Sequence, residues 1–128
     1  MMPDKRIIVV VEDEPDTAEM FAEMMRLSGY EVLKSFGGST AITLITELMP
    51  DAIILDLMMP DLSGLEVLDY LRKDPHLAAI PVIIVSAKSL PADIKTGLEA
   101  GAAVYLTKPV SFKDLKQAVE RAIQANIK

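Results

Sequence analysis

Cysteine is absent from this 128-residue chain, and histidine occurs once, as His76. The absence of cysteine excludes a disulfide scaffold and cysteine-based zinc sites. His76 has no second histidine with which to share a metal ion. It follows Asp74 and Pro75 in an evident turn, so we expect it to be exposed. A chain without cysteine also suits the cytoplasm, the compartment that we expect.

Long hydrophobic runs and basic stretches are missing as well. The apolar run 7–11 holds five residues before Glu12, too few for a signal-peptide core or a membrane span. Thirteen basic residues stand against nineteen acidic ones, giving a net charge of −6 without any Lys/Arg-rich stretch. This balance argues against direct binding of nucleic acid. We therefore expect a soluble protein that binds neither a membrane nor nucleic acid.

The length fits a single domain that can bury a core. No internal repeat, low-complexity segment or Gly/Ser-rich linker divides the chain. We expect one domain over residues 1–128, with a core from about residue 5 to residue 125 and no output domain.

Short β-branched runs alternate with segments of helical periodicity, which predicts an α/β fold with a parallel sheet buried on both faces. The strands are expected at residues 6–11, 30–35, 52–56, 82–86 and 103–107. The helices are expected from Pro15 to the Ser28-Gly29 stop and at residues 39–48, 64–73, 91–100 and 111–123. Their inward stripes are Ala18, Phe21, Ala22 and Met25; Ala41, Leu44, Ile45 and Leu48; Leu65, Leu68 and Leu71; and Leu115, Ala118, Val119 and Ala122.

The fourth predicted helix is the least regular one. Gly97 lies inside it, and a glycine within a helix costs about 1 kcal/mol relative to alanine. We expect this helix to be short or mobile.

Charged residues follow three of the apolar runs. Glu12 and Asp13 end the first run, Asp56 ends the third, and Lys108 ends the fifth. In a parallel sheet these positions share one edge, where ligands bind. A glycine-rich phosphate loop is absent after the first run, and three acidic residues and a proline stand in its place. The pattern favours a hard divalent cation such as Mg²⁺, which would offset the charge of an incoming phosphoryl group and of the carboxylate that attacks it.

Four segments, in this order and spacing, resemble the receiver domain of two-component response regulators. They are residues 8–15 (Ile-Val-Val-Val-Glu-Asp-Glu-Pro), 53–64 (Ile-Ile-Leu-Asp-Leu-Met-Met-Pro-Asp-Leu-Ser-Gly), 82–87 (Val-Ile-Ile-Val-Ser-Ala) and 101–109 (Gly-Ala-Ala-Val-Tyr-Leu-Thr-Lys-Pro). The resemblance covers the chain from about residue 5 to residue 125. It implies a flavodoxin-like (CheY-like) doubly wound sheet of five parallel strands in the order 2-1-3-4-5, with five helices.

The resemblance also implies the chemistry of the acidic residues. Asp56 would be the phosphoacceptor that attacks the phosphohistidine of a sensor histidine kinase or a histidine phosphotransfer protein. Asp13 would bind Mg²⁺ directly, together with Asp56 and the backbone carbonyl of Met58, and Mn²⁺ could replace Mg²⁺. Glu12 occupies a position where many receivers carry aspartate, so direct and water-mediated binding both stay open. Lys108 would pair with Asp56, and then with a phosphoryl oxygen.

Three further positions match parts of the receiver switch. Ser86 matches the hydroxyl that binds the phosphoryl group, and Tyr105 matches the aromatic residue that moves inward when it does so. Pro109 is expected to follow a cis peptide bond. Met58 and Lys88 lie two residues beyond Asp56 and Ser86, where receiver side chains influence the access of water. We expect these two side chains to set the lifetime of the phosphoryl group.

A stand-alone receiver would bind a downstream protein through its fourth helix, fifth strand and fifth helix. Ala103 and Val104 stand where many dimeric receivers carry acidic residues, so we expect a monomer or a weak dimer. A receiver fragment of a longer transcriptional or enzymatic regulator and a phosphorylation-independent pseudo-receiver are the alternatives. A haloacid-dehalogenase-type phosphatase would need a second aspartate where Met58 stands. Apart from accepting its own phosphoryl group and losing it by autodephosphorylation, we expect no independent enzymatic activity.

Overall fold

Five short segments form one parallel sheet in the computed structural model, which describes residues 5–126. The strands are β1 (Ile7–Val11), β2 (Glu31–Ser35), β3 (Ala52–Leu55), β4 (Val82–Ser86) and β5 (Val104–Thr107). They lie in the order β2-β1-β3-β4-β5, and every neighbouring pair is parallel. The predicted strand order is confirmed.

The predicted strand limits were one residue too wide in four places. Arg6, Tyr30, Asp56 and Ala103 lie outside the strands, whereas residues 82–86 form β4 as predicted. The register of paired residues begins at Ile7 with Glu31 and ends at Val11 with Leu55. Asp56 therefore directly follows the last paired residue of β3.

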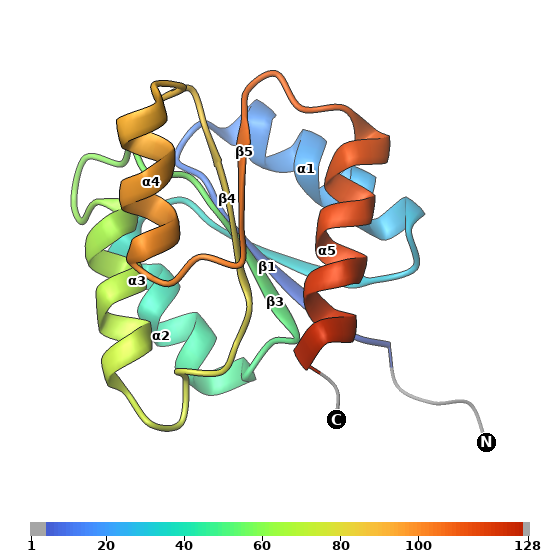
Figure 1. Ribbon diagram of the computed structural model, residues 1–128. Helices are drawn as coiled ribbons and strands as arrows, with labels where there is room; N and C mark the ends of the chain where they lie inside the picture. Colours follow the sequence, from blue (N-terminus) through green and yellow to red (C-terminus); the bar gives the residue numbers. More distant parts are fainter. Residues whose placement is uncertain (1–4, 127–128) are drawn as a thin grey trace.

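Five helices cover the two faces of the sheet (Figure 1). Helices α1 (Pro15–Leu27) and α5 (Phe112–Asn126) lie on one face, and α2 (Gly38–Leu48), α3 (Gly64–Lys73) and α4 (Pro91–Glu99) lie on the other. Alternate strand residues point to opposite faces, so that Ile8 and Val10 pack under α1 and α5 while Val9 and Val11 pack under α2 and α3. The three central strands are thus apolar on both sides, as a buried parallel sheet requires.

The predicted inward residues agree best with the buried residues in α1 and α5. All predicted inward residues of α1 and α5 are buried, and Ile123 joins them. On the second face, Leu44, Leu48 and Leu65 are only partly buried, and Val67, which the periodicity did not select, is fully buried. Leu65 instead lines a groove between α2 and α3. The inward face of α3 is therefore centred on Val67, Leu68 and Leu71.

Several helix ends also differ from the predicted ones. Helix α2 begins one residue earlier, at Gly38, and α4 ends at Glu99 rather than at residue 100. Helix α5 begins at Phe112, with the Ser111 hydroxyl accepting a hydrogen bond from the Asp114 N–H, and it continues to Asn126. Helix α4, with nine residues, is the shortest of the five, as the glycine inside it indicated. His76 is exposed, as predicted.

Gly64 brings the start of α3 against the segment that carries Asp56. Its N–H donates to the Leu57 carbonyl over 3.0 Å, and a Cβ atom at this position would lie 2.7 Å from the Leu57 Cα and 3.0 Å from the Asp56 carbonyl carbon. Carbon atoms pack best at about 3.5–4.0 Å. A side chain here would collide with backbone atoms, which cannot rotate away.

We predict that Gly64→Ala lowers the free energy of unfolding by about 1–3 kcal/mol, because the added methyl group overpacks this junction. Urea unfolding provides the measurement. Gly37→Ala is the control, since the atoms nearest to its Cβ, from 3.2 Å, belong to the end of the Asp61 side chain and not to the backbone. Equal losses in the two variants would contradict the steric explanation.

Candidate functional site

The carboxyl ends of the strands position the charged residues that the sequence singled out. Glu12 follows β1, and its N–H donates to the Ser35 carbonyl over 3.0 Å. The Asp56 N–H donates to the Val11 carbonyl over 3.0 Å, and the Lys108 N–H donates to the Ser86 carbonyl over 2.9 Å. Each residue thus continues the hydrogen bonding of the sheet by one step. The loops after β4 and β5 lie at the top of Figure 1, at this same edge.

Lys108 forms ion pairs with two buried carboxylates. Its Nζ atom lies 2.7 Å from Glu12 Oε1 and 3.1 Å from Asp56 Oδ2. The side chains of Glu12 and Asp56 are 2% and 8% exposed. Two carboxylates that are removed from water and lie against the same ammonium group repel each other, and that ammonium group offsets the repulsion.

Burial and ion pairing oppose each other in this cluster. Burial raises the pKa of the Glu12 carboxyl above its ordinary value, against the opposite effect of the hydrogen bond from Lys108. Burial alone would lower the pKa of Lys108, but the hydrogen bonds and charges of Glu12 and Asp56 outweigh it, and the pKa of Lys108 is raised. Lys108 is therefore held as a cation.

The carboxylates form a group that suits a cation. One oxygen from each of Glu12, Asp13 and Asp56 lies within 4.8 Å of the other two. Asp13 is not buried. Hard oxygen donors of this kind are the ligands that Mg²⁺ takes in proteins, so the residues present fit such an ion.

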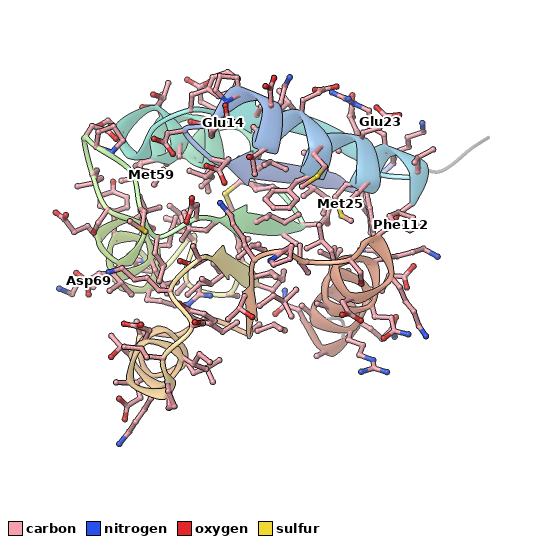
Figure 2. The ribbon with its side chains drawn as sticks, turned by 90° about the horizontal axis from the view of Figure 1, so that it is seen from above. Glu14, Glu23, Met25, Met59, Asp69 and Phe112 are labelled. Atoms are coloured by element: carbon pink, nitrogen blue, oxygen red, sulfur yellow. The ribbon has the colours of Figure 1, made fainter. Side chains whose placement is uncertain are left out.

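Glu12 is the most constrained member of the group. Its Oε1 atom accepts from Lys108, and its Oε2 atom accepts from the Glu14 N–H over 3.2 Å. Both oxygens therefore have partners within the protein. Figure 2 views the molecule from above and shows Glu14, at the start of α1, and Met59, in the loop after β3, at this edge.

Asp56 is held from two sides. Its Oδ1 atom accepts from the Met58 N–H over 3.2 Å, and its Oδ2 atom faces Lys108. The side chain of Met58 is 55% exposed beside it. The peptide bond between Lys108 and Pro109 is cis, as predicted.

Ser86 and Tyr105 are linked by the backbone of Lys88. The buried Ser86 hydroxyl accepts from the Lys88 N–H over 3.2 Å, and the Tyr105 hydroxyl donates to the Lys88 carbonyl over 2.7 Å. Burial raises the pKa of the Tyr105 hydroxyl. The side chain of Lys88 is exposed. The sequence drew attention to that side chain, but it gave no indication of this backbone link.

Asp61 is a site-loop residue that the sequence analysis missed. Its carboxylate accepts from the N–H groups of Gly38 and Ser39, each over 3.1 Å, and thereby joins the loop after β3 to the start of α2. The hydrogen bonds from Ser39 and Gly38 hold the pKa of Asp61 well below its usual range. The available signal was the glycine at the position preceding α2, which leaves that helix without a capping side chain of its own.

A further groove of the described part of the chain lies away from the charged residues at the sheet edge. It has a volume of about 920 Å³ and lies between α2 and α3, where Ile42, Leu65 and Tyr70 line it. None of the charged residues at the sheet edge contributes to it. Within residues 5–126, no helix combines the length and the apolar character needed to cross a membrane.

A family model described as the response regulator receiver domain matches residues 8–120. Curated relatives include the DNA-binding response regulator MtrA of Mycolicibacterium smegmatis, 37% identical over 93% of this chain and 51% of that protein. A probable transcriptional regulatory protein, TcrX of Mycobacterium tuberculosis, is 39% identical over 84% of this chain and 45% of its own length. The chain spans about half the length of these relatives.

Solved structures agree with the fold. The crystal structure of a putative response regulator from Chloroflexus aurantiacus has a TM-score of 0.91 and 29% identity, covering 94% of this chain and 99% of that one. The receiver domain of the sensor histidine kinase PA1611 from Pseudomonas aeruginosa, described with a magnesium ion coordinated in its active-site cleft, has a TM-score of 0.87 and 29% identity, with the same coverage.

We predict that Lys108→Ala, in buffer without divalent cations, lowers the free energy of unfolding by about 1–3 kcal/mol, because two buried carboxylates lose their shared cation. Added Mg²⁺ should recover part of the loss, since it offsets the same charge. Urea unfolding with and without Mg²⁺ measures both effects. Lys116→Ala is the control, because the exposed pair of Lys116 with Glu120 is worth less than about 0.5 kcal/mol. Similar losses in the two variants would count against the role given to Lys108.

Proposed function

This chain belongs to the response regulator receiver domain family, and from that premise we propose that it is a phosphorylation-dependent signalling switch. One observation carries the proposal: the buried Asp56 carboxylate lies at the sheet edge with Lys108 on one oxygen and two further carboxylates beside it. Proteins of this family are signalling proteins, and they receive their phosphoryl groups from histidine kinases.

We propose that Asp13, Asp56 and the backbone carbonyl of Met58 hold Mg²⁺, for which Mn²⁺ could substitute. When bound, the ion would offset negative charge on the entering phosphoryl group. Both oxygens of Glu12 already have partners in Lys108 and the Glu14 N–H, which supports contact through water. Glu12 would then serve chiefly to hold Lys108 in place.

Asp56 would act as the nucleophile. One carboxylate oxygen attacks the phosphorus of a phosphohistidine, the P–N bond breaks, and the imidazole nitrogen keeps the electron pair of that bond. Lys108 would turn from Asp56 Oδ2 to a phosphoryl oxygen and so stabilise the charge that is transferred. The Met58 N–H holds Oδ1 of the carboxylate over 3.2 Å and would keep it oriented for this attack.

The signal would pass through Ser86 and Tyr105. The Ser86 hydroxyl would donate to a phosphoryl oxygen, and the Lys88 backbone links Ser86 to the Tyr105 hydroxyl. Phosphorylation can shift the population of the arrangement only by stabilising one state more than the other. The added hydrogen bond of Ser86 would provide that difference.

We place the downstream partner on the face formed by α4, β5 and α5, and we expect a monomer or a weak dimer in the cytoplasm. For this domain we propose contact with proteins rather than with nucleic acid, in line with the net charge of −6.

The relatives MtrA and TcrX are DNA-binding or transcriptional regulators about twice as long. Their length supports a second candidate, the receiver part of such a regulator. The intact set of Glu12, Asp13, Asp56 and Lys108 argues against a pseudo-receiver.

We predict that Mg²⁺ with a small phosphodonor such as acetyl phosphate adds one phosphoryl group to the protein, because Asp56 and the bound ion supply the nucleophile and the charge compensation. Intact mass measures the product. Asp56→Asn and an EDTA-treated sample should gain nothing, whereas Asp69→Asn, which changes an exposed carboxylate on α3, should be labelled like the wild type. No gain in a folded protein that binds Mg²⁺ would favour a phosphorylation-independent adaptor.

We predict that Met58→Ala and Lys88→Ala shorten the lifetime of the phosphoryl group by about two- to fivefold, a change of less than 1.4 kcal/mol in the barrier. Both side chains would screen Asp56 from attacking water. Decay of the phosphorylated mass after removal of the donor measures this lifetime. Met20→Ala removes a methionine of α1 that is 46% exposed, against 55% for Met58, and should decay like the wild type. Wild-type decay in both variants would refute the screening role.

A further inference from the structure

Helix α4 approaches the sheet through a glycine. Gly97 is the only buried residue of this helix, whereas each of the other four helices buries at least three residues. A Cβ atom at Gly97 would lie 2.7 Å from Cδ2 of Tyr105 and 3.0 Å from Cδ1 of Ile84. Carbon atoms pack best at about 3.5–4.0 Å. The ring of Tyr105 therefore occupies the space that any side chain at position 97 would need.

The Tyr105 ring is fixed at its other end by a hydrogen bond. Its hydroxyl donates to the Lys88 carbonyl over 2.7 Å, and the Lys88 N–H donates to the Ser86 hydroxyl over 3.2 Å. A continuous series of contacts thus runs from Ser86, at the end of the strand that neighbours β3, through Lys88 and Tyr105 to the backbone of α4 at Gly97. The two ends of this series are the phosphoryl site and the outer helix.

We propose that Gly97 is a positioning residue for Tyr105: its missing side chain admits the tyrosine ring beneath α4 and so couples α4 to the phosphoryl site. The inference rests on the proposed function, and it concerns the regulation of the same site. A methyl group at position 97 would expel the ring, because the ring can rotate about its side-chain bonds whereas the neighbouring helix backbone cannot move alone. The hydrogen bond to Lys88 would be lost with it.

The stability gain from replacing glycine by alanine within a helix provides the reference for a test. Replacing glycine by alanine at an open position inside a helix favours the folded state about fivefold. The pair Lys95→Gly and Lys95→Ala measures this gain at an exposed site of α4. At position 97 the same gain should be cancelled or reversed by the collision with Tyr105.

The first test is a double-mutant cycle on the unphosphorylated protein, followed by urea unfolding. Gly97→Ala should give no gain in the wild type, and its effect should be more favourable in the Tyr105→Ala background, with a difference between the two backgrounds of about the fivefold gain of the Lys95 pair. The 3.0 Å approach to Ile84 remains in both backgrounds and cancels in the cycle. A gain at position 97 that is the same with and without Tyr105 would overturn the proposal.

The second test follows Tyr105 itself by fluorine NMR of protein labelled with 3-fluorotyrosine, with the resonance assigned by Tyr105→Phe. In the wild type, acetyl phosphate and Mg²⁺ should shift this resonance. In Gly97→Ala, Asp56 should be phosphorylated to the same extent by intact mass, while the Tyr105 resonance stays in one position. A wild-type shift in Gly97→Ala would refute the role of Gly97 and leave the proposed function intact. If neither protein is phosphorylated, the proposed function fails, and the unfolding cycle still decides the role of Gly97.

Discussion

The shared ion pair of Lys108 with Glu12 and Asp56 is the interaction on which the site depends. Two carboxylates that are almost fully removed from water repel each other at one sheet edge, and the ammonium group of Lys108 between them offsets that repulsion. Lys108 comes from the far side of the sheet order, since β5 and β1 are separated by β3 and β4. The ion pair therefore requires β1, β3, β4 and β5 to lie side by side, and the position of Asp56 beside Lys108 depends on correct folding of these four strands.

Backbone hydrogen bonds fix the positions of these three charged residues. Glu12, Asp56 and Lys108 each lie one residue past a strand, and each still donates to the neighbouring strand. Their Cα positions are therefore set by the regular spacing of the sheet rather than by loop conformation. Asp61 extends the same order to the loop after β3, which it fastens to the start of α2 through two N–H groups. A rigid edge of this kind can hold an ion and orient a nucleophile without a large rearrangement.

The sequence was sufficient for features that repeat. The short β-branched runs between helical segments predicted the ends of the strands to within one residue. The apolar stripe from Ala18 to Met25 predicted the buried face of α1. Features that depend on a single tertiary contact were not accessible. The rotation of α3 that buries Val67 follows from its packing beside α2, and the double engagement of Glu12 follows from the reach of its longer side chain to both Lys108 and the Glu14 N–H. The close approach of Gly97 to Tyr105 likewise joins residues whose contact no periodicity encodes.

Helix α4 buries a single residue against the sheet, and this affects which parts of such a domain can vary. Because α4 meets the sheet at Gly97, most of its other residues face solvent and carry little of the core. Mutations on this helix can therefore accumulate without disturbing the charged edge, as long as the glycine and the ring beneath it persist. The charged edge around Asp56 and the exposed residues of α4 can thus change independently, so that copies of such a domain can differ in this outer surface while keeping the same charged edge.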